Sequence, residues 1–514
     1  MESGKTLLVN GAAYTDLQCA IEAVRCNRTD GDGWMNLAEK ISSNEIVEEK
    51  DSIDCQAYTK HQCYVEALRC DPNRTLAWIN LGQCMNCGDT CEMNGTKYSK
   101  RQCFLEALRC DNDSASAWIL LGNALHRKQE TVYVDGKTYD EQQCYLEALR
   151  CDPDSFDGWY YLSSTMSNRA TTALVNGAVY NPVECCVEAV LRDRSYADAW
   201  EILADVMTNT EAVDVDGKHY TKLNCFQEAL RLDSQKPTAW NSLGRTLSAN
   251  QAVSVNGKDY SKCDCFIAAI GCSPTFSPPW INLAAGMARG QKATINGKDY
   301  TKQDCYLEVL RYHPNSTCAW DGLGVILLST DVDVVVNGKR YTKPQCFVEA
   351  LRCNPNNGNA WMHLGNTIAG RDSTVAVNGR DCNKQRCHEE ALRCKPDSGA
   401  AWNRLGVTLP GDHPVEVNDK VYNKQQCYME ALRFNANYSN AWGNLGGTLT
   451  SNQTLEVDGR QYTKQMCYLE ALRCDDTNKN AWKGLGGTLT ERQTIVVNGR
   501  TVDKKECNRA ARNE

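Results

Sequence analysis

The stretch CYVEALRCDPNRTLAWINLG, residues 63–82, decides the fold because close copies of it recur at a fixed interval along the chain. All 12 tryptophans of the 514-residue chain occupy the same place in this unit. After a first gap of 44 residues their spacing is 40 or 41: Trp34, Trp78, Trp118, Trp159, Trp200, Trp240, Trp280, Trp320, Trp361, Trp402, Trp442 and Trp482. A repeat of this length cannot bury its apolar face alone and must stack on its neighbours. The period therefore predicts an array whose working part is a surface.

The unit resembles the tetratricopeptide repeat. The resemblance rests on two groups of residues, Tyr64, Ala67, Leu68 and Pro72 in one helix and Ala77, Trp78, Leu81 and Gly82 in the next, and similar residues recur in all 12 copies. It implies a mainly α fold, an α-solenoid of about 12 helical pairs wound into a superhelix that binds peptides or proteins along a concave face. Two features depart from the family: the period exceeds its usual length of about 34 residues, and the second helices are rich in cysteine.

A repeat array is one body, so we expect a single array over residues 1–514. It comprises a half-repeat at 1–30, full repeats of 40–44 residues from about 31 to 474, and a C-terminal repeat with a polar cap at 475–514. The net charge of −8 has no basic block, which argues against a nucleic-acid partner. No apolar run approaches the ~18 residues of a membrane span. Without a signal peptide at the start, the chain is expected to be cytoplasmic; an extracellular or cell-surface fibre is the alternative if a signal segment has been removed.

A second recurring element is VSVNGKDY at 253–260, with copies starting at residues 7, 132, 213, 334 and 455. An Asn-Gly or Asp-Gly pair between β-branched runs predicts a β-hairpin with a two-residue turn. Each repeat, counted from residue 31, thus has a short hairpin inserted between its two helices, which explains its extra length. Pairing places Val253, Val255, Lys258 and Tyr260 on one face, and we expect the Val/Tyr face to lie on the helices.

The spacing of the hairpins allows two arrangements. Helix layers stack ~8–10 Å apart, and two paired strands occupy ~9.6 Å, so hairpins such as Val253–Tyr260 and Ala293–Tyr300 could join into a continuous ribbon. The alternative, which we favour, is that each hairpin packs only on its own helices.

The helix after each hairpin begins at a good N-cap residue, and Thr59 with Gln62 has the pattern of a capping box. The 13 caps are Thr15, Thr59, Ser99, Asp140, Asn181, Thr221, Ser261, Thr301, Thr342, Asn383, Asn423, Thr463 and Asp503. Residues 43–58 lengthen the first repeat and lack the Asn-Gly turn, which predicts a longer, mobile loop. Asn508 and Arg512 replace apolar residues in the last helix, as a solenoid end facing water requires.

Cysteines occupy two places of the unit, seven residues apart. Thirteen of the 29 stand at the first place: Cys19, Cys63, Cys103, Cys144, Cys185, Cys225, Cys265, Cys305, Cys346, Cys387, Cys427, Cys467 and Cys507. Eight stand at the second: Cys26, Cys70, Cys110, Cys151, Cys272, Cys353, Cys394 and Cys474. The other copies of this second place have Arg192, Leu232, Tyr312 and Phe434. Three of these four residues are apolar, which favours thiols that pack as small apolar groups. Two residues seven apart on a helix are ~10 Å apart, too far for a disulfide. Bridges between successive repeats remain the alternative to reduced thiols.

Chemistry-bearing motifs are sparse. Cys84, Cys87 and Cys91 have C-x2-C-x3-C spacing, with Cys55 as a candidate fourth ligand, but without a second C-x2-C the spacing indicates zinc only weakly. The seven histidines stand at unrelated places of the repeats, so no nucleophile has a recurring base. Gly446 is expected at a close helix contact, and the tryptophans in the core. We therefore predict no catalytic, cofactor-binding or metal-binding residue and no enzyme activity.

The function expected from this pattern is a non-catalytic protein–protein interaction scaffold, with a protein or peptide partner on the concave face or the hairpin edge. The residues after each tryptophan should line that face: Met35, Ile79, Ile119, Tyr160, Glu201, Asn241, Ile281, Asp321, Met362, Asn403, Gly443 and Lys483. Only one of them is basic, so the carboxylate clamp of some family members is not expected. The alternative is a structural subunit of a fibre, a cytoskeletal or ciliary lattice, or another large assembly that self-associates end to end.

Overall fold

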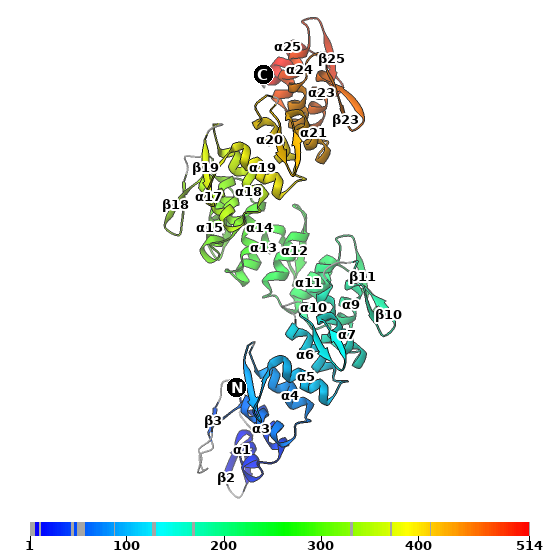
Figure 1. The fold of residues 1–514 in the computed structure, drawn as a ribbon, viewed down its shortest axis with the longest axis vertical. Coiled ribbons are helices and arrows are strands. Elements are labelled where there is room, and N and C mark those ends of the chain that lie inside the picture. The colour runs from blue at the N-terminus through cyan, green and yellow to red at the C-terminus, as the bar shows by residue number, and fades with distance from the viewer. Residues whose placement is uncertain are drawn as a thin grey trace. The chain divides into compact units, whose positions relative to one another are not determined.

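In the computed structural model the described residues are 6–9, 12–42, 46–48, 57–86, 88–125, 130–166, 170–328, 333–370, 373–411 and 413–512. The chain divides into two compact units, residues 1–265 and 266–514, each of which is described by itself. Across these ranges there are 25 helices and 26 strands, and one order, hairpin, helix, helix, returns along each unit (Figure 1). The predicted mainly α array of paired helices with inserted hairpins is confirmed.

Two kinds of helix alternate. The Cys helices carry the first-place cysteines: α1 (Asp16–Cys26), α3 (Lys60–Cys70), α5 (Lys100–Cys110), α7 (Glu141–Cys151), α9 (Pro182–Arg192), α11 (Lys222–Leu232), α13 (Lys262–Cys272), α15 (Lys302–Tyr312), α17 (Lys343–Cys353), α19 (Lys384–Cys394), α21 (Lys424–Phe434), α23 (Lys464–Cys474) and α25 (Lys504–Arg512). The Trp helices carry the tryptophans: α2 (Gly31–Lys40), α4 (Thr75–Cys84), α6 (Ala115–Leu125), α8 (Phe156–Thr165), α10 (Ala197–Val206), α12 (Pro237–Thr246), α14 (Ser277–Gly286), α16 (Thr317–Ile326), α18 (Gly358–Thr367), α20 (Gly399–Thr408), α22 (Ser439–Thr448) and α24 (Lys479–Thr488).

A two-stranded antiparallel hairpin precedes each Cys helix. The pairs are β1 (Thr6–Val9) with β2 (Ala12–Thr15), β3 (Ile46–Glu48) with β4 (Ala57–Thr59), β5 (Thr90–Met93) with β6 (Thr96–Ser99), β7 (Val132–Val134) with β8 (Lys137–Tyr139), β9 (Ala173–Val175) with β10 (Ala178–Tyr180), β11 (Ala212–Val215) with β12 (Lys218–Thr221), β13 (Ala252–Val255) with β14 (Lys258–Ser261), β15 (Lys292–Ile295) with β16 (Lys298–Thr301), β17 (Asp333–Val336) with β18 (Lys339–Thr342), β19 (Thr374–Val377) with β20 (Arg380–Asn383), β21 (Val415–Val417) with β22 (Lys420–Tyr422), β23 (Thr454–Val457) with β24 (Arg460–Thr463), and β25 (Thr494–Val497) with β26 (Arg500–Asp503).

Each tryptophan closes the turn between its Trp helix and the preceding Cys helix. The indole Nε1 donates to the backbone oxygen six residues earlier, as from Trp240 to Ser234 at 2.9 Å. All 12 tryptophans make this bond. A buried indole N–H needs such an acceptor, and 11 of the rings are at most 6% exposed. The prediction that the tryptophans belong to the core is confirmed, and only Trp482 is half-buried.

The predicted hairpin geometry is confirmed. Val253 pairs with Tyr260, the turn residues Asn256 and Gly257 have φ of 51° and 79°, and Val255 is buried at 3% exposure. The inner face meets the helices through aromatic rings, since the centroid of Tyr260 lies 4.6 Å from that of the Trp240 ring. Ten hairpins place a tyrosine on the tryptophan of the preceding helix in this way, at 4.6–5.1 Å.

A continuous hairpin ribbon is wrong, because every sheet among the described residues consists of the two strands of one hairpin. The hairpins contact the helices through their inner faces and their turns, and no hairpin edge pairs with a neighbouring hairpin among the described residues. Asn256 Nδ2 donates to the backbone oxygen of Leu230 on α11 at 3.3 Å. Four other turn asparagines make the same bond to a Cys helix.

Helix ends follow the predicted signals. Thr59 Oγ1 accepts the N–H of Gln62 at 3.3 Å, and the Gln62 side chain accepts the N–H of Thr59 at 2.8 Å, which completes the capping box. The predicted long loop falls mostly on residues 49–56, which lie outside the described residues; on either side β3 and β4 pair from Ile46 with Thr59. In the last helix Asn508 is exposed as predicted.

In six of the 13 Cys helices, a lysine at the first helical position binds the end of the preceding Trp helix. Lys222 Nζ donates to the backbone oxygen of Met207 at 3.0 Å, and five other lysines at the first helical position do the same. A cation at a helix C-terminus satisfies an orphan carbonyl and opposes the negative end of the helix dipole.

Several glycines mark close helix contacts. Gly446, predicted at such a contact, has the Cβ of Cys467 3.1 Å from where its own Cβ would lie. At Gly406 on α20 an added Cβ would lie 2.6 Å from the ring of Tyr428 on α21. At Gly443, on the neighbouring Trp helix, the nearest side-chain atoms would be 4.0 Å away.

The Gly406→Ala variant should therefore lose about 1–3 kcal/mol of unfolding free energy, because the Tyr428 ring must move. The Gly443→Ala variant is the matched control and should gain about 0.5–1 kcal/mol, since alanine favours the helix and meets no obstacle. Urea denaturation followed by circular dichroism measures both. Equal effects of the two changes would contradict the close contact at Gly406.

Candidate binding surface

The Trp helices of neighbouring repeats contact one another, as α4 does with α6 and α6 with α8 in the first unit, and α20 with α22 and α22 with α24 in the second. The side of these helices on which they meet is called here the Trp-helix face. Five of the 12 residues that follow a tryptophan are buried there: Ile79, Ile119, Glu201, Asn241 and Asn403. The prediction that all 12 line an open groove is wrong for these five, because the helices lie close enough for them to fill the contact between repeats.

Polar side chains link successive Trp helices at this contact. Asn444 Nδ2 donates to Oδ1 of Asn403 at 2.9 Å, and Nδ1 of His363 lies 2.9 Å from Oδ1 of Asp321. These residues stand 41 and 42 positions apart, about one repeat. Their polar groups are thus used within the array.

Other residues of the Trp-helix face stay open. Phe156, Tyr160, Tyr161 and Tyr196 form a continuous group, named here the aromatic cluster. Ring centroids lie 5.6 Å apart between Phe156 and Tyr160, 4.9 Å between Phe156 and Tyr196, and 5.1 Å between Tyr160 and Tyr161. Tyr196 is 39% exposed, and the other three are half-buried. A surface patch of four packed rings is typical of a binding site, since aromatic side chains dominate the energetics of interfaces.

The surroundings of the aromatic cluster are acidic. Lys236 Nζ binds both Asp198 and Glu201, the latter at 2.9 Å. Burial disfavours its charge, but the bonds to the two carboxylates outweigh this and raise the pKa of Lys236. One lysine thus faces two carboxylates. Asp157, in the first turn of α8, adds a third, and partial burial raises its pKa. Counting these four side chains, the edge of the cluster has a net charge of about −2 at neutral pH.

The Trp-helix face of the second unit has a hollow between α16, α17 and α18. Its volume is about 340 Å³, and it is lined by Val325, Leu328, Lys343, Phe347, His363, Asn366 and Thr367. Val325 and Leu328 are 50% and 70% exposed. Lys343 and His363 already bind the oxygen of Leu327 and the carboxylate of Asp321. The open part of this hollow is therefore apolar.

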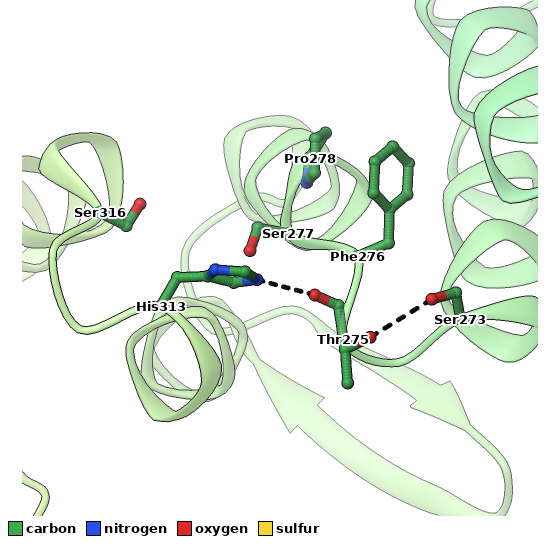
Figure 2. Close-up of a pocket in the computed structure, with 7 residues that line it drawn as sticks. All are labelled: Ser273, Thr275, Phe276, Ser277, Pro278, His313 and Ser316. Carbon is green, nitrogen blue, oxygen red and sulfur yellow. Dashed lines mark hydrogen bonds between the residues drawn. The ribbon is translucent and has the colours of Figure 1, made fainter. Parts of the chain in front are cut away.

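A hollow of about 490 Å³ lies where the turns before α14 and α16 meet (Figure 2). Nε2 of His313 lies 2.9 Å from the backbone oxygen of Thr275, so this nitrogen carries the proton. Ser277 Oγ is buried and has no hydrogen-bond partner among the described residues. A serine nucleophile needs a base bonded to its hydroxyl, and His313 does not bind Ser277. The geometry thus provides no activated serine.

The C-x2-C-x3-C segment does not assemble into a metal site within the described residues. Cys84 is exposed and Cys91 is buried, while Cys87 and Cys55 lie outside the described part. No three His, Cys, Asp or Glu side chains in the described ranges are placed to hold a metal ion. Cys91 is unusual in another way: hydrogen bonding with the neighbouring Cys103 thiol, and then with His61, lowers its pKa, although burial opposes this.

The two cysteine places differ in burial. Twelve of the 13 first-place thiols have no exposed surface, and burial raises the pKa of Cys144 and most others to about 12. The second-place thiols are half-buried or exposed. Cys110 and Cys151 pack against the core as predicted, whereas Cys26 and Cys70 are exposed, and the prediction that they pack as small apolar groups is wrong for these two. Cys70 Sγ donates instead to the oxygen of Arg28 at 3.5 Å, the same oxygen that accepts the Trp34 indole. All 27 cysteines in the described ranges are free thiols.

A buried histidine was missed by the sequence analysis. His388 on α19 has no exposed surface, and neither ring nitrogen has a hydrogen-bond partner among the described residues. Burial, followed by the charges of Lys384 and Arg404, lowers its pKa to about 3. The sequence could have shown that His388 is buried, because the residues at the same place of other Cys helices, such as Tyr428 and Phe347, are large aromatic residues of the core.

His388 makes stability depend on pH. The unfolded chain binds a proton there below a pKa of ~6.5, whereas the folded protein does so only below about 3. Between these values the unfolded state holds more protons, so the free energy of unfolding falls as the pH drops, by up to ~1.4 kcal/mol per pH unit.

The His388→Phe variant has no group that titrates at this position, so it should not lose this part of its unfolding free energy at low pH. Its advantage over the wild type in urea unfolding should widen from pH 7 to pH 4. His219→Gln, at an exposed hairpin position, is the control; a constant advantage of His388→Phe would contradict the assignment.

No protein-family model matches the sequence, and no curated protein matches it. Two of the solved structures that match the chain are both of low sequence identity to it. YrrB, described as a TPR protein with an unusual peptide-binding site, is 13% identical; the match covers 44% of this chain and 98% of YrrB with a TM-score of 0.27. Yeast Tom70 is 13% identical; the match covers 84% of each chain with a TM-score of 0.32. At these values neither match assigns a function to this chain.

No helix in the described ranges is long and apolar enough to cross a membrane.

Proposed function

We propose that this chain is a non-catalytic scaffold that binds a protein or peptide partner, and that the aromatic cluster on α8 is its main docking point. The observation that carries the proposal is the group of four packed rings at the surface, of which Tyr196 is exposed and the other three are half-buried, because the side chains that repeat are used within the array. Rings at this density on an open surface supply a large contact area at low conformational cost.

The charge around the aromatic cluster selects the partner segment. Asp157, Asp198 and Glu201 outnumber Lys236, so a lysine or arginine side chain is attracted to the rim. The same cation can lie over the face of Tyr160 or Tyr196, where cation–π attraction adds about 0.5–2 kcal/mol. The expected ligand is therefore a basic segment with at least one apolar or aromatic anchor.

A phage-displayed random peptide library tests the proposal. Selection on the full chain should enrich peptides rich in Lys or Arg whose binding weakens with salt. Tyr160→Ala or Tyr196→Ala should weaken the selected peptides by tenfold or more, as truncation of a central anchor does. Tyr133→Ala removes another tyrosine, 69% exposed on β7, and should leave binding unchanged. Peptides that bind all three variants like the wild type would overturn the assignment.

The structural-subunit alternative has one observation in its favour. Leu174 and Val179 pair directly across β9 and β10, and each is 64% exposed on the outer face. Other hairpins also expose an apolar outer residue: Tyr133, Val335, Val421 and Val496. Two-stranded hairpins leave backbone groups unpaired at both edges, and apolar edges favour association.

Sedimentation velocity separates the two functions. A self-associating subunit should form larger species as its concentration rises, and Leu174→Lys together with Val179→Lys should return it to a monomer. Glu456→Lys, on the outer face of β23 opposite the polar Gln461, is the control for added charge. A wild type that stays monomeric over the accessible concentration range excludes self-association through these hairpins and leaves the scaffold.

A further inference from the structure

The hairpin before α19 departs from the ring contact found in ten other hairpins. In those hairpins a tyrosine lies on the tryptophan of the preceding helix. In four of them a lysine two residues earlier lies over the tyrosine ring, 4.6–5.2 Å from its centroid. The tyrosine is thus held between an indole and a cation.

Cys382 occupies the place of this tyrosine on β20. It pairs with Val375 as Tyr341 pairs with Val334 in the preceding hairpin. The side chain is much smaller, and a cavity of about 480 Å³ opens beside it. Trp361, Val377, Cys382, Arg380, Arg386 and Glu390 are among its lining residues. Trp361 is 6% exposed and Cys382 4% exposed, so both belong to the inner wall of this cavity. This cavity is named here the Cys382 slot.

The hairpin before α19 also has a cation at the place where a lysine covers the tyrosine ring in four other hairpins. Arg380 stands where Lys339 stands in the preceding hairpin, two residues before the ring position, and it lines the slot. A ring that enters the slot would therefore meet the Trp361 indole and a guanidinium, the same two kinds of group that hold the tyrosines elsewhere. Arginine stacks on aromatic faces at least as well as lysine.

Two further arginines make the slot cationic. Arg393 Nε lies 2.7 Å from Glu390, and Arg386 lies 3.4 Å from the same carboxylate. With Arg380 there are three cations against two lining carboxylates, Glu390 and Asp381. Burial raises the pKa of the Cys382 thiol, so the thiol stays neutral and does not repel an anion.

Arg386 is a second departure from the repeat at the same site. In the next Cys helix the equivalent Gln426 completes a capping box with Asn423. Arg386 makes no capping box with Asn383, and its guanidinium reaches along α19 towards Glu390. The tyrosine is thus absent and a cation is added in one and the same repeat.

We propose that the Cys382 slot is a ligand site for a phenyl ring that carries an anionic group. The ring takes the place that tyrosines hold in the other hairpins, between Trp361 and Arg380. The anionic group lies at the mouth, where Arg386 and Arg393 are more than half exposed and can reach it. Arginine binds carboxylate and phosphate oxygens through paired N–H donors, which gives both strength and direction.

Calorimetric titration of the full chain with four probes tests the proposal: phenyl phosphate, p-cresol, cyclohexyl phosphate and inorganic phosphate. Phenyl phosphate should bind best at one site per chain. p-Cresol should bind about tenfold more weakly, because the charge-assisted bonds are missing. Inorganic phosphate binding as tightly as phenyl phosphate would overturn the ring site, and so would equal binding of cyclohexyl phosphate. A phosphotyrosyl peptide binding more tightly than phenyl phosphate would support the site and identify a protein as the source of the ring.

Two variants test whether phenyl phosphate binds in the Cys382 slot. Cys382→Tyr restores the residue of the other hairpins, should raise the unfolding midpoint by filling the cavity, and should abolish binding of phenyl phosphate. Arg386→Gln restores the residue of α21 and should weaken phenyl phosphate about tenfold while leaving p-cresol unchanged. Unchanged phenyl phosphate binding by Cys382→Tyr would overturn the proposal.

The matched third variant is Tyr422→Cys, which removes the ring from the next hairpin. It should open a second slot against Trp402 and raise the number of p-cresol sites from one to two, with circular dichroism showing that the helices persist. A folded Tyr422→Cys protein with one p-cresol site would show that a missing tyrosine does not create a ring site, and the argument would fail.

Discussion

The bond from each indole N–H to the oxygen six residues earlier is the constraint on which the rest of the repeat depends. It spans the short turn between a Cys helix and its Trp helix and holds the tryptophan ring against that turn. Trp240 makes it to Ser234, and the hairpin tyrosine then covers the open side of the same ring. The hairpin is thus placed by the tryptophan and not by a neighbouring sheet.

The acceptor oxygen also connects repeats. Arg28 O accepts both the Trp34 indole and, from the next Cys helix, the Cys70 thiol, and Pro72 O does the same for Trp78 and Cys110. A backbone oxygen has two lone pairs and can accept both. The thiol bond is weak, so stacking of the repeats depends mainly on buried apolar groups such as the first-place cysteines, twelve of which have no exposed surface.

Much of the fold could be predicted because its signals are local. The Asn-Gly turns need positive φ, the capping boxes are read over four residues, and the period locates every tryptophan. Other predictions depended on how repeats meet. Asn403 is buried because Asn444 of the next Trp helix binds it, and Cys70 is exposed because the turn that it touches is open to water. The aromatic cluster joins Phe156 and Tyr196, whose neighbourhood depends on the spacing of α8 and α10. No pattern within one repeat contains that spacing.

In an array of near-identical units, a residue that recurs in every copy serves the unit, so a ligand site has to be sought where one copy differs. Substitution of a single core residue would ordinarily destabilise its repeat, yet Cys382, Arg386 and His388 all depart from the pattern within seven residues of α19 and its hairpin. His388 leaves two buried nitrogens without partners, which costs about 1–3 kcal/mol. A repeat can retain such a cost because its neighbours on both sides hold it in place. These three departures thus lie in a repeat that has regular repeats on both sides, and a cavity lies there beside Trp361.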